Sequence, residues 1–172
     1  MDGADGAEFQ PRYWVSITIL KLCAFQINFC HSFGPTLCGE WSQADTDCAQ
    51  YLNNVNVGAR WTGTMNTNDP KTQVLSPTCP KNGGVCECDD ANADPSKYSP
   101  LYKQWLQMFA EAQMASFEKG WGWFYWTWET EKSVQWSWKL GLQAGILPKK
   151  AYAPDFNCSE EVPSFQGLPE NY

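Results

Sequence analysis

The sequence predicts an α/β fold organised around parallel strands. Residues 36–38 and 121–126 are short apolar runs without polar alternation, and turn residues bound both of them. That pattern is typical of strands buried on both faces. Helix-compatible sequence follows each run, and strand-then-helix repeats are characteristic of α/β proteins, whose site residues lie at the carboxyl ends of the strands. Glu40, which follows the first run, is therefore the first candidate site residue.

Composition and charge limit the function classes. The chain has 172 residues, enough for one domain with a core. Its net charge of −7 argues against a nucleic-acid ligand, because phosphate binding needs a basic surface. Ten tryptophans help to raise the aromatic share to 15%, and they either fill a core or offer flat apolar platforms to sugar rings. A neutral partner is predicted.

The cysteines indicate disulfides and an oxidising compartment. There are eight, an even number, and Cys79, Cys86 and Cys88 crowd one loop. A zinc site is the weaker alternative, because Cys86 and Cys88 are only two apart and the chain has one histidine, His31. We therefore predict disulfides and no metal site, with Cys48 paired to one of the loop cysteines.

Secretion is the predicted localisation. Residues 157–159, Asn-Cys-Ser, form an N-glycosylation sequon, and Cys158 is expected to pair with Cys30. The apolar run at residues 14–29 is too short for a membrane span and lacks the flanks of a signal peptide. We predict no membrane contact, and we expect residues 1–32 to be an atypical, partly disordered leader.

Loops and a short helix are expected after the first strand. Residues 45–47 carry side-chain oxygens suited to cap a helix at residues 48–54. A loop is predicted at residues 58–68. Residues 69–100 are rich in Pro, Gly, Asn and Asp, and their cysteines predict an insertion pinned as an ordered flap.

The clearest helix lies between the two strands. Ser99 is a good N-cap, Pro100 suits the first helical position, and apolar residues then recur at helical spacing until Lys119. This helix is expected to pack on the sheet, with Trp105 and Met108 in the core.

A second helix is predicted at residues 136–144, where Gly145 and Pro148 end it. Residues 149–172 form a tail without periodic pattern.

Two motifs carry a family resemblance. Residues 38–42 read Cys-Gly-Glu-Trp-Ser, and Thr-Asp-Cys-Ala and Tyr-Leu-Asn follow at residues 46–49 and 51–53. Residues 122–131 end in Tyr-Trp-Thr-Trp-Glu-Thr-Glu, and residues 142–148 read Leu-Gln-Ala-Gly-Ile-Leu-Pro. The first group resembles the segment around the nucleophile of fungal exo-β-1,3-glucanases of glycoside hydrolase family five. The others are similar to that family's final barrel strand and closing helix.

The resemblance implies a partial (β/α)8 TIM barrel over residues 33–148, with the insertion at residues 69–100 and the tail at residues 149–172. It also implies a secreted retaining hydrolase that releases glucose from β-1,3-glucan and needs no metal or cofactor. Within that mechanism Glu40 matches the nucleophile.

Tryptophans near the strand ends are the implied substrate-binding residues. Trp126 matches the tryptophan under the terminal glucose. Trp41 and Trp128 either line the pocket or pack behind it, and we expect packing for both. Glu129 and Glu131 are expected to be solvated rather than catalytic.

One part of the family's site has no match. The acid/base residue of the family lies in an Asn-Glu-Pro tripeptide, which this sequence lacks, and a retaining enzyme needs a second carboxyl group about 5 Å from the nucleophile. The chain is therefore expected to be the C-terminal portion of such an enzyme. An inactive glucan-binding or signalling protein and a disulfide-rich structural protein are the alternatives. Two strands alone leave unpaired edges, so the chain is also expected either to self-associate or to cover the sheet with its N-terminal segment.

Overall fold

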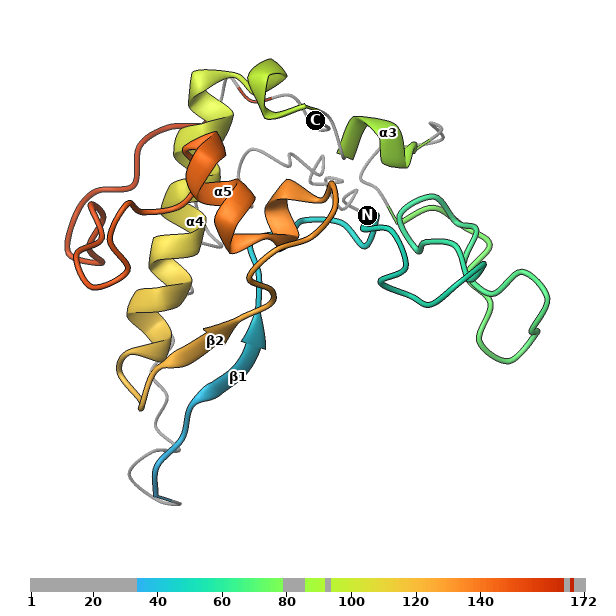
Figure 1. Ribbon diagram of the computed structural model, residues 1–172, viewed down its shortest axis with the longest axis horizontal. Coiled ribbons are helices and arrows are strands. Elements are labelled where there is room, and N and C mark those ends of the chain that lie inside the picture. The colour runs from blue at the N-terminus through green and yellow to red at the C-terminus, as the bar shows by residue number, and fades with distance from the viewer. Residues whose placement is uncertain (1–33, 79–85, 92–93, 166–167, 169–172) are drawn as a thin grey trace, which may run out of the picture.

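The computed structural model describes residues 34–78, 86–91, 94–165 and 168. In these ranges the chain forms, in order, β1 (Cys38–Trp41), α3 (Cys88–Ala91), η1 (Pro95–Lys97), α4 (Pro100–Phe117), β2 (Trp123–Tyr125), η2 (Val134–Trp136) and α5 (Trp138–Ala144). Figure 1 shows α4 running beside the two strands. The predicted α/β character is confirmed. Residues 1–32, expected to be a leader, lie outside the described residues.

The sheet is a parallel pair with a bulge in β1. Cys38 pairs with Trp123 and Trp41 pairs with Tyr125, so three residue steps on β1 oppose two on β2. One extra residue bends a strand and changes which side chains share a face. As a result Cys38 and Trp41 both contact the same apolar cluster against α4.

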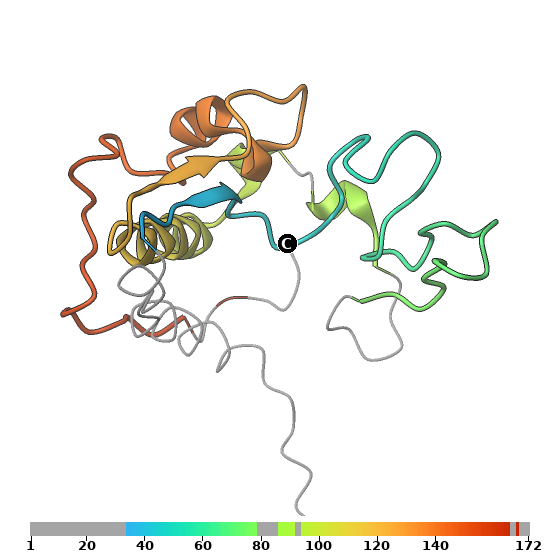
Figure 2. The same cartoon turned by 90° about the horizontal axis from the view of Figure 1, so that it is seen from below.

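Helix α4 begins and ends where the sequence predicts. The Ser99 hydroxyl accepts a hydrogen bond from the Tyr102 backbone N–H at 3.1 Å, and Pro100 occupies the first turn. Ala110 and Met114, fully buried on one side of the helix, pack against Trp41 of the sheet. Figure 2 shows the two strands lying over α4. The predicted helix and its packing on the sheet are confirmed.

The sheet is buried on one face only, so the prediction of strands buried on both faces is wrong. Leu37 and Phe124 are exposed, as is Trp121 just before β2. Neighbouring side chains of a strand point to opposite faces, and α4 covers one of them. In the part of the chain that the structure describes, the sheet has two strands and its second face stays open.

The helix predicted at residues 48–54 is also wrong, because that segment forms turns. The carboxylate of Asp47, one of the three candidate caps at residues 45–47, instead accepts hydrogen bonds from the backbone N–H groups of Arg60 and Trp61. A short carboxylate that binds distant backbone donors gives the chain an alternative to a helix. The loop predicted at residues 58–68 is confirmed.

The second predicted helix is confirmed with a later start. Its first predicted residue, Trp136, belongs to η2 instead, and α5 begins at Trp138 after the Ser137 hydroxyl caps it by accepting from Leu140 N at 3.1 Å. Gly145 ends α5 with a φ of 71°, a left-handed conformation that glycine adopts without a steric cost.

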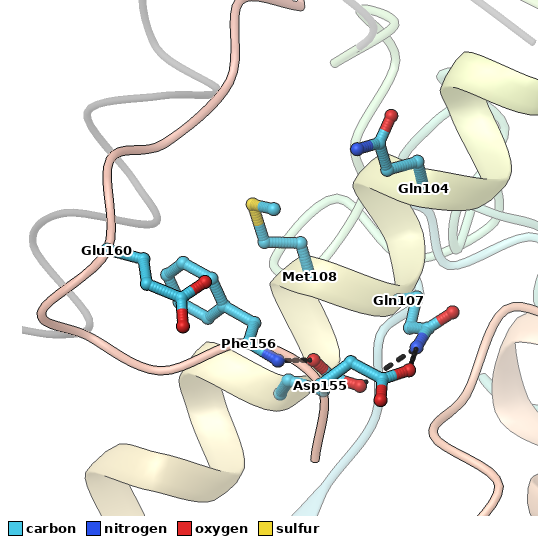
Figure 3. Close-up of a pocket in the computed structure, with 7 residues that line it drawn as sticks. Gln104, Gln107, Met108, Asp155, Phe156 and Glu160 are labelled. Carbon is cyan, nitrogen blue, oxygen red and sulfur yellow. Dashed lines mark hydrogen bonds between the residues drawn. The ribbon is translucent and has the colours of Figure 1, made fainter.

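The tail returns to the core rather than running free. Phe156, Phe165 and Leu168 are buried in one cluster with residues of α4, including Trp105 as predicted. The backbone N–H of Phe156 donates to the buried Glu111 carboxylate at 2.7 Å (Figure 3). Met108, predicted in the core, packs against the cluster only partly buried, and it lines a cavity of about 170 Å³ under the tail.

Candidate active site at the carboxyl ends of β1 and β2

Glu40 and Trp126 lie at adjacent strand ends. Glu40 is the next-to-last residue of β1, and Trp126 follows β2 directly. The Trp126 backbone N–H donates to the Trp41 carbonyl oxygen at 2.8 Å, which continues the pairing of the strands beyond β2. The parallel pairing therefore brings together the two residues that the sequence had placed 86 positions apart.

The Glu40 side chain is open to solvent because of the bulge. Since Cys38 and Trp41 both pack toward α4, Gly39 and Glu40 are left on the exposed side. Within the described ranges, no side chain or backbone group binds the Glu40 carboxylate. The backbone carbonyl oxygen of Glu40 accepts a hydrogen bond from Cys38 Sγ at 3.4 Å. The carboxylate is thus available to a ligand at the sheet's carboxyl edge.

Trp41 packs behind Glu40, as expected. It is 6% exposed, and its ring meets those of Trp123 and Tyr125 edge to face at centroid distances of 5.2 and 5.0 Å. Phe117 of α4 lies 5.6 Å away on a tilted ring. Edge-to-face aromatic pairs of this kind hold each other in fixed orientation. Trp41 therefore fixes the backbone next to Glu40 and presents no open ring face.

Trp126 and Trp128 both present exposed rings. Trp126 is 49% exposed and Trp128 is 64% exposed, so the expectation that Trp128 packs behind the site is wrong. The peptide bond between Trp126 and Thr127 is cis. The backbone that carries the two rings is fixed, because Thr127 O accepts from Trp138 N at 2.8 Å and Trp128 O accepts from Lys139 N at 2.9 Å.

The two carboxylates after β2 lie at the surface, as predicted. Glu129 forms an ion pair with Lys139, with 2.7 Å between Oε1 and Nζ, and both side chains remain about half exposed. Glu131 is exposed as well. Surface ion pairs of this kind contribute little to stability.

A polar contact point that the sequence did not predict joins the segments around the site. Gln135 accepts from Asp45 N at 3.3 Å through Oε1, and it donates from Nε2 to the Tyr102 hydroxyl at 2.8 Å. The backbone carbonyl oxygen of Gln135 accepts a hydrogen bond from the Tyr125 hydroxyl at 2.7 Å. Burial raises the pKa of Tyr125 well above its ordinary value, so this hydroxyl remains a donor. Gln135 thereby ties the chain after β1 to β2 and α4.

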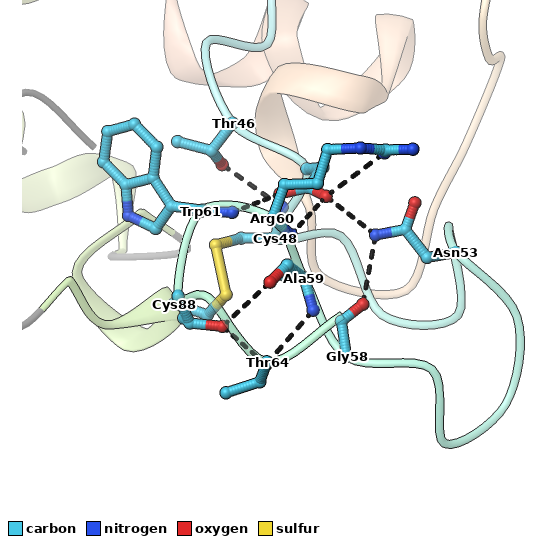
Figure 4. Close-up of polar contacts among 11 residues, drawn as sticks. Thr46, Cys48, Asn53, Gly58, Ala59, Arg60, Trp61, Thr64 and Cys88 are labelled. Carbon is cyan, nitrogen blue, oxygen red and sulfur yellow. Dashed lines mark hydrogen bonds and ion pairs between the residues drawn. A yellow bond between two sulfur atoms is a disulfide. The ribbon is translucent and has the colours of Figure 1, made fainter. Parts of the chain in front are cut away.

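Asp47 is the centre of a second polar cluster (Figure 4). Its carboxylate accepts from Arg60 N at 2.7 Å, Trp61 N at 2.9 Å and Asn53 Nδ2 at 2.8 Å. Burial by itself raises the pKa of Asp47, but these hydrogen bonds outweigh it and hold the pKa below the ordinary 3.8. Asp47 therefore holds the loop after β1 in place as an ionised group.

The lowered pKa predicts a pH dependence for Asp47. A carboxyl group whose pKa is lower in the folded state adds stability above the unfolded value of 3.8, and loses it as the pH falls toward the folded value. We expect Asp47→Asn to lower the free energy of unfolding by about 2 kcal/mol near neutral pH and by much less at about pH 3. Urea titrations of both proteins across this range measure the difference. If Asp47→Asn lowers the free energy of unfolding by the same amount at all pH values, the charge of Asp47 does not stabilise the folded state.

Disulfides account for two of the cysteines weighed as zinc ligands. Cys48 is bonded to Cys88, which confirms the predicted pairing of Cys48 with a loop cysteine. Cys86 and Cys158 are also disulfide-bonded, whereas Cys38 is free. The proposed partner of Cys158, Cys30, lies outside the described residues.

No group of three or more His, Cys, Asp or Glu side chains is placed to hold a metal ion in the described ranges. Searched over the same ranges, the chain has no helix with the length and apolar character of a membrane span.

Comparison with known proteins gives close matches. The chain is 57% identical over 140 residues to a protein of Aspergillus terreus named "Probable glucan 1,3-beta-glucosidase D", and 56% identical over 149 residues to the protein of that name from Aspergillus clavatus. These alignments cover 81% and 86% of this chain. The chain is homologous to part of the fungal glucan 1,3-beta-glucosidases.

The similarity covers a small part of these relatives. It spans 16% of the A. terreus glucosidase and 17% of the A. clavatus one, and a third glucosidase, from Aspergillus niger, is 55% identical over 86% of this chain and 17% of its own length. No protein-family model matches the chain. The resemblance to fungal exo-β-1,3-glucanases is confirmed. Because the chain spans so little of these glucosidases, we treat their activity as a proposal for this chain.

Proposed function

We propose that this chain carries the nucleophile of a retaining hydrolase that releases glucose from β-1,3-glucan. The observation that carries the proposal is the position of Glu40 and Trp126 at adjacent ends of two parallel strands, with the Trp126 ring exposed and the Glu40 carboxylate exposed and bound by no described residue. The homology of the chain to proteins named as glucan 1,3-beta-glucosidases supports β-1,3-glucan as the substrate class.

Glu40 acts as the nucleophile in this proposal. A Glu40 oxygen forms a bond to the anomeric carbon of the terminal glucose while the glycosidic C–O bond breaks, and the departing oxygen takes a proton from an acid. Water then adds to the anomeric carbon, gives a proton to the resulting base and releases Glu40, so the glucose leaves with retained configuration.

The aromatic residues have separate parts in this scheme. Trp126 supplies the platform under the terminal glucose, because flat rings suit the apolar faces of sugars. Trp128 extends that exposed surface, whereas Trp41 positions Glu40 from behind.

The acid/base carboxyl group is proposed to come from a more complete barrel. Residues 33–148, with the insertion at residues 69–100, form one portion of a (β/α)8 barrel in this proposal, residues 1–32 form a leader and residues 149–172 a tail. The pair β1 and β2, linked through α4, supports it, since parallel strands joined through a helix are the repeating unit of that barrel. The open sheet face supports self-association or further strands.

The proposed setting is extracellular, in contact with β-glucan and not with nucleic acid or a membrane. The Cys48–Cys88 disulfide supports an oxidising compartment, and the net charge of −7 opposes phosphate binding.

Glucose release from β-glucosyl fluoride tests the function, because fluoride departs without a proton from the acid that is not assigned within this chain. The purified chain is expected to release glucose first seen as the β-anomer by NMR. Light scattering on the same sample reports self-association. Release of the α-anomer contradicts the retaining mechanism. Binding of laminari-oligosaccharides without any release supports the inactive glucan-binding alternative instead.

A further inference from the structure

A second cavity is lined mainly by the loop between β1 and α3. Figures 1 and 2 show this loop to the right of the sheet. The cavity measures about 450 Å³, within the usual range for small-molecule sites. Side chains that carry amides or hydroxyls line it, among them those of Gln50, Asn53, Asn54, Asn56, Thr62 and Thr64, and Tyr51 adds one aromatic ring. Apolar atoms make up most of the lining surface, and Asp47 is its one carboxylate. The cavity therefore combines apolar surface with neutral hydrogen-bonding groups.

The walls of this cavity are fixed by bonds within the loop. Asp47 holds Arg60 and Trp61 through their backbone N–H groups, and the Cys48–Cys88 disulfide joins the loop to α3 (Figure 4). Gly58 has a φ of 78°, and a Cβ there would lie 2.3 Å from the Thr64 carbonyl oxygen, so the close approach requires glycine. Because these bonds already fix the loop backbone, a ligand binds without the entropy cost of ordering the site.

The side chains at the rim remain available to a ligand. Tyr51 is 63% exposed, and within the described residues neither its hydroxyl nor the amides of Gln50 and Asn56 have a hydrogen-bond partner. Tyr51 and Asn56 also have positive φ values, 64° and 60°. That conformation is uncommon for a bulky residue such as tyrosine and is found most often where function requires it.

The chemistry of the lining selects a neutral, hydroxylated ligand. Amides and hydroxyls both donate and accept, which matches the hydroxyls of a sugar, and the Tyr51 ring matches its apolar face. The one carboxylate in the lining, Asp47, is already bound by Asn53, Arg60 and Trp61, so it offers no site for a cation.

We propose that this cavity binds glucosyl units of a β-glucan chain at a distance from Glu40, as an accessory subsite. The inference rests on the proposed function for the identity of the sugar. The subsite gives a long glucan chain a contact that glucose alone does not make. The affinity for glucan is therefore expected to increase with chain length.

The test measures binding of laminarihexaose in a background without the proposed glucose platform. The Glu40→Gln/Trp126→Ala chain is titrated with laminarihexaose and with glucose by isothermal calorimetry. Tyr51→Asn and, separately, Asn56→Gly are added to it, because both new residues tolerate a positive φ and leave the backbone unstrained. The control is Tyr152→Asn, which removes a tyrosine that is 83% exposed outside the cavity.

We expect Tyr51→Asn to weaken laminarihexaose binding about tenfold, Asn56→Gly to weaken it about threefold, and the control to leave it unchanged. Equal affinity in the Tyr51 and Tyr152 variants, or no binding by the background chain at millimolar laminarihexaose, overturns the subsite. The two proposals fail differently. Absent glucose release with Tyr51-dependent binding rejects the hydrolase alone, and release without Tyr51-dependent binding rejects the subsite alone.

Discussion

Glu40→Gln is expected to lower the rate of fluoride release from β-glucosyl fluoride by about 10⁴-fold, the scale on which loss of a nucleophile acts. Fluoride departs without a proton from an acid, so this substrate reports the nucleophile even in a chain without the Asn-Glu-Pro tripeptide. Glutamine keeps the size of the side chain and removes the attacking oxygen's charge. Because Glu40 is exposed and its carboxylate binds no described residue, the variant is expected to fold like the parent.

The matched control is Glu131→Gln, which alters an exposed carboxylate in the loop after β2. It is expected to retain the fluoride-releasing rate. In a Glu40→Ala chain, added azide is expected to restore turnover and give the α-glucosyl azide, since the small anion attacks from the vacated side. A rate that survives Glu40→Gln but is lost in Glu131→Gln would assign the nucleophile to the other loop.

Elements set by nearby residues were predictable from the sequence. Ser99 and Pro100 define the start of α4 by a hydrogen bond and a backbone angle that need only adjacent residues. Gly145 defines the end of α5 in the same local way. The helix predicted at residues 48–54 does not form, and Asp47, one of its three candidate caps, binds backbone donors 13 and 14 residues later. Periodicity within a short window carries no information about such partners.

The site was predictable in its residues but not in its geometry. Glu40 and Trp126 were identified from motifs, and the structure places them at adjacent strand ends. The bulge that leaves Glu40 open depends on how β1 pairs with β2, which no pattern within β1 reveals. Gln135 was missed because its three hydrogen bonds reach α4, β2 and the loop after β1, and a glutamine in a short turn carries no sequence signal of that role.

The aromatic content has two interpretations, and the structure divides the tryptophans into a buried group and an exposed group. Trp41 and Trp105 are buried and stabilise the core, as a filling role requires. Trp126 and Trp128 stay exposed at the carboxyl edge, as platforms require. The composition alone cannot separate these groups, because burial depends on which face of the sheet α4 covers.

Replacing both Cys48 and Cys88 with serine is expected to lower the free energy of unfolding by about 4 kcal/mol, a large part of a typical domain's stability. The bond joins residues 40 apart, and a crosslink that closes a loop of this length restricts the unfolded chain strongly. Urea titration followed by tryptophan fluorescence measures the loss. Cys38→Ser, which alters a free cysteine, is the control and is expected to change stability much less.

The double serine variant also separates two interactions that order the loop lining the second cavity. Asp47 binds Arg60 and Trp61 within the loop itself, whereas the disulfide crosslinks Cys48 of the loop to Cys88 of α3. Without that link, proteases are expected to cut the loop faster, since opening it costs less free energy. An unchanged urea midpoint and an unchanged cleavage rate would show that the hydrogen bonds of Asp47 suffice to hold the loop. Faster cleavage with the Asp47 pH dependence intact would show that the disulfide and the carboxylate stabilise it independently.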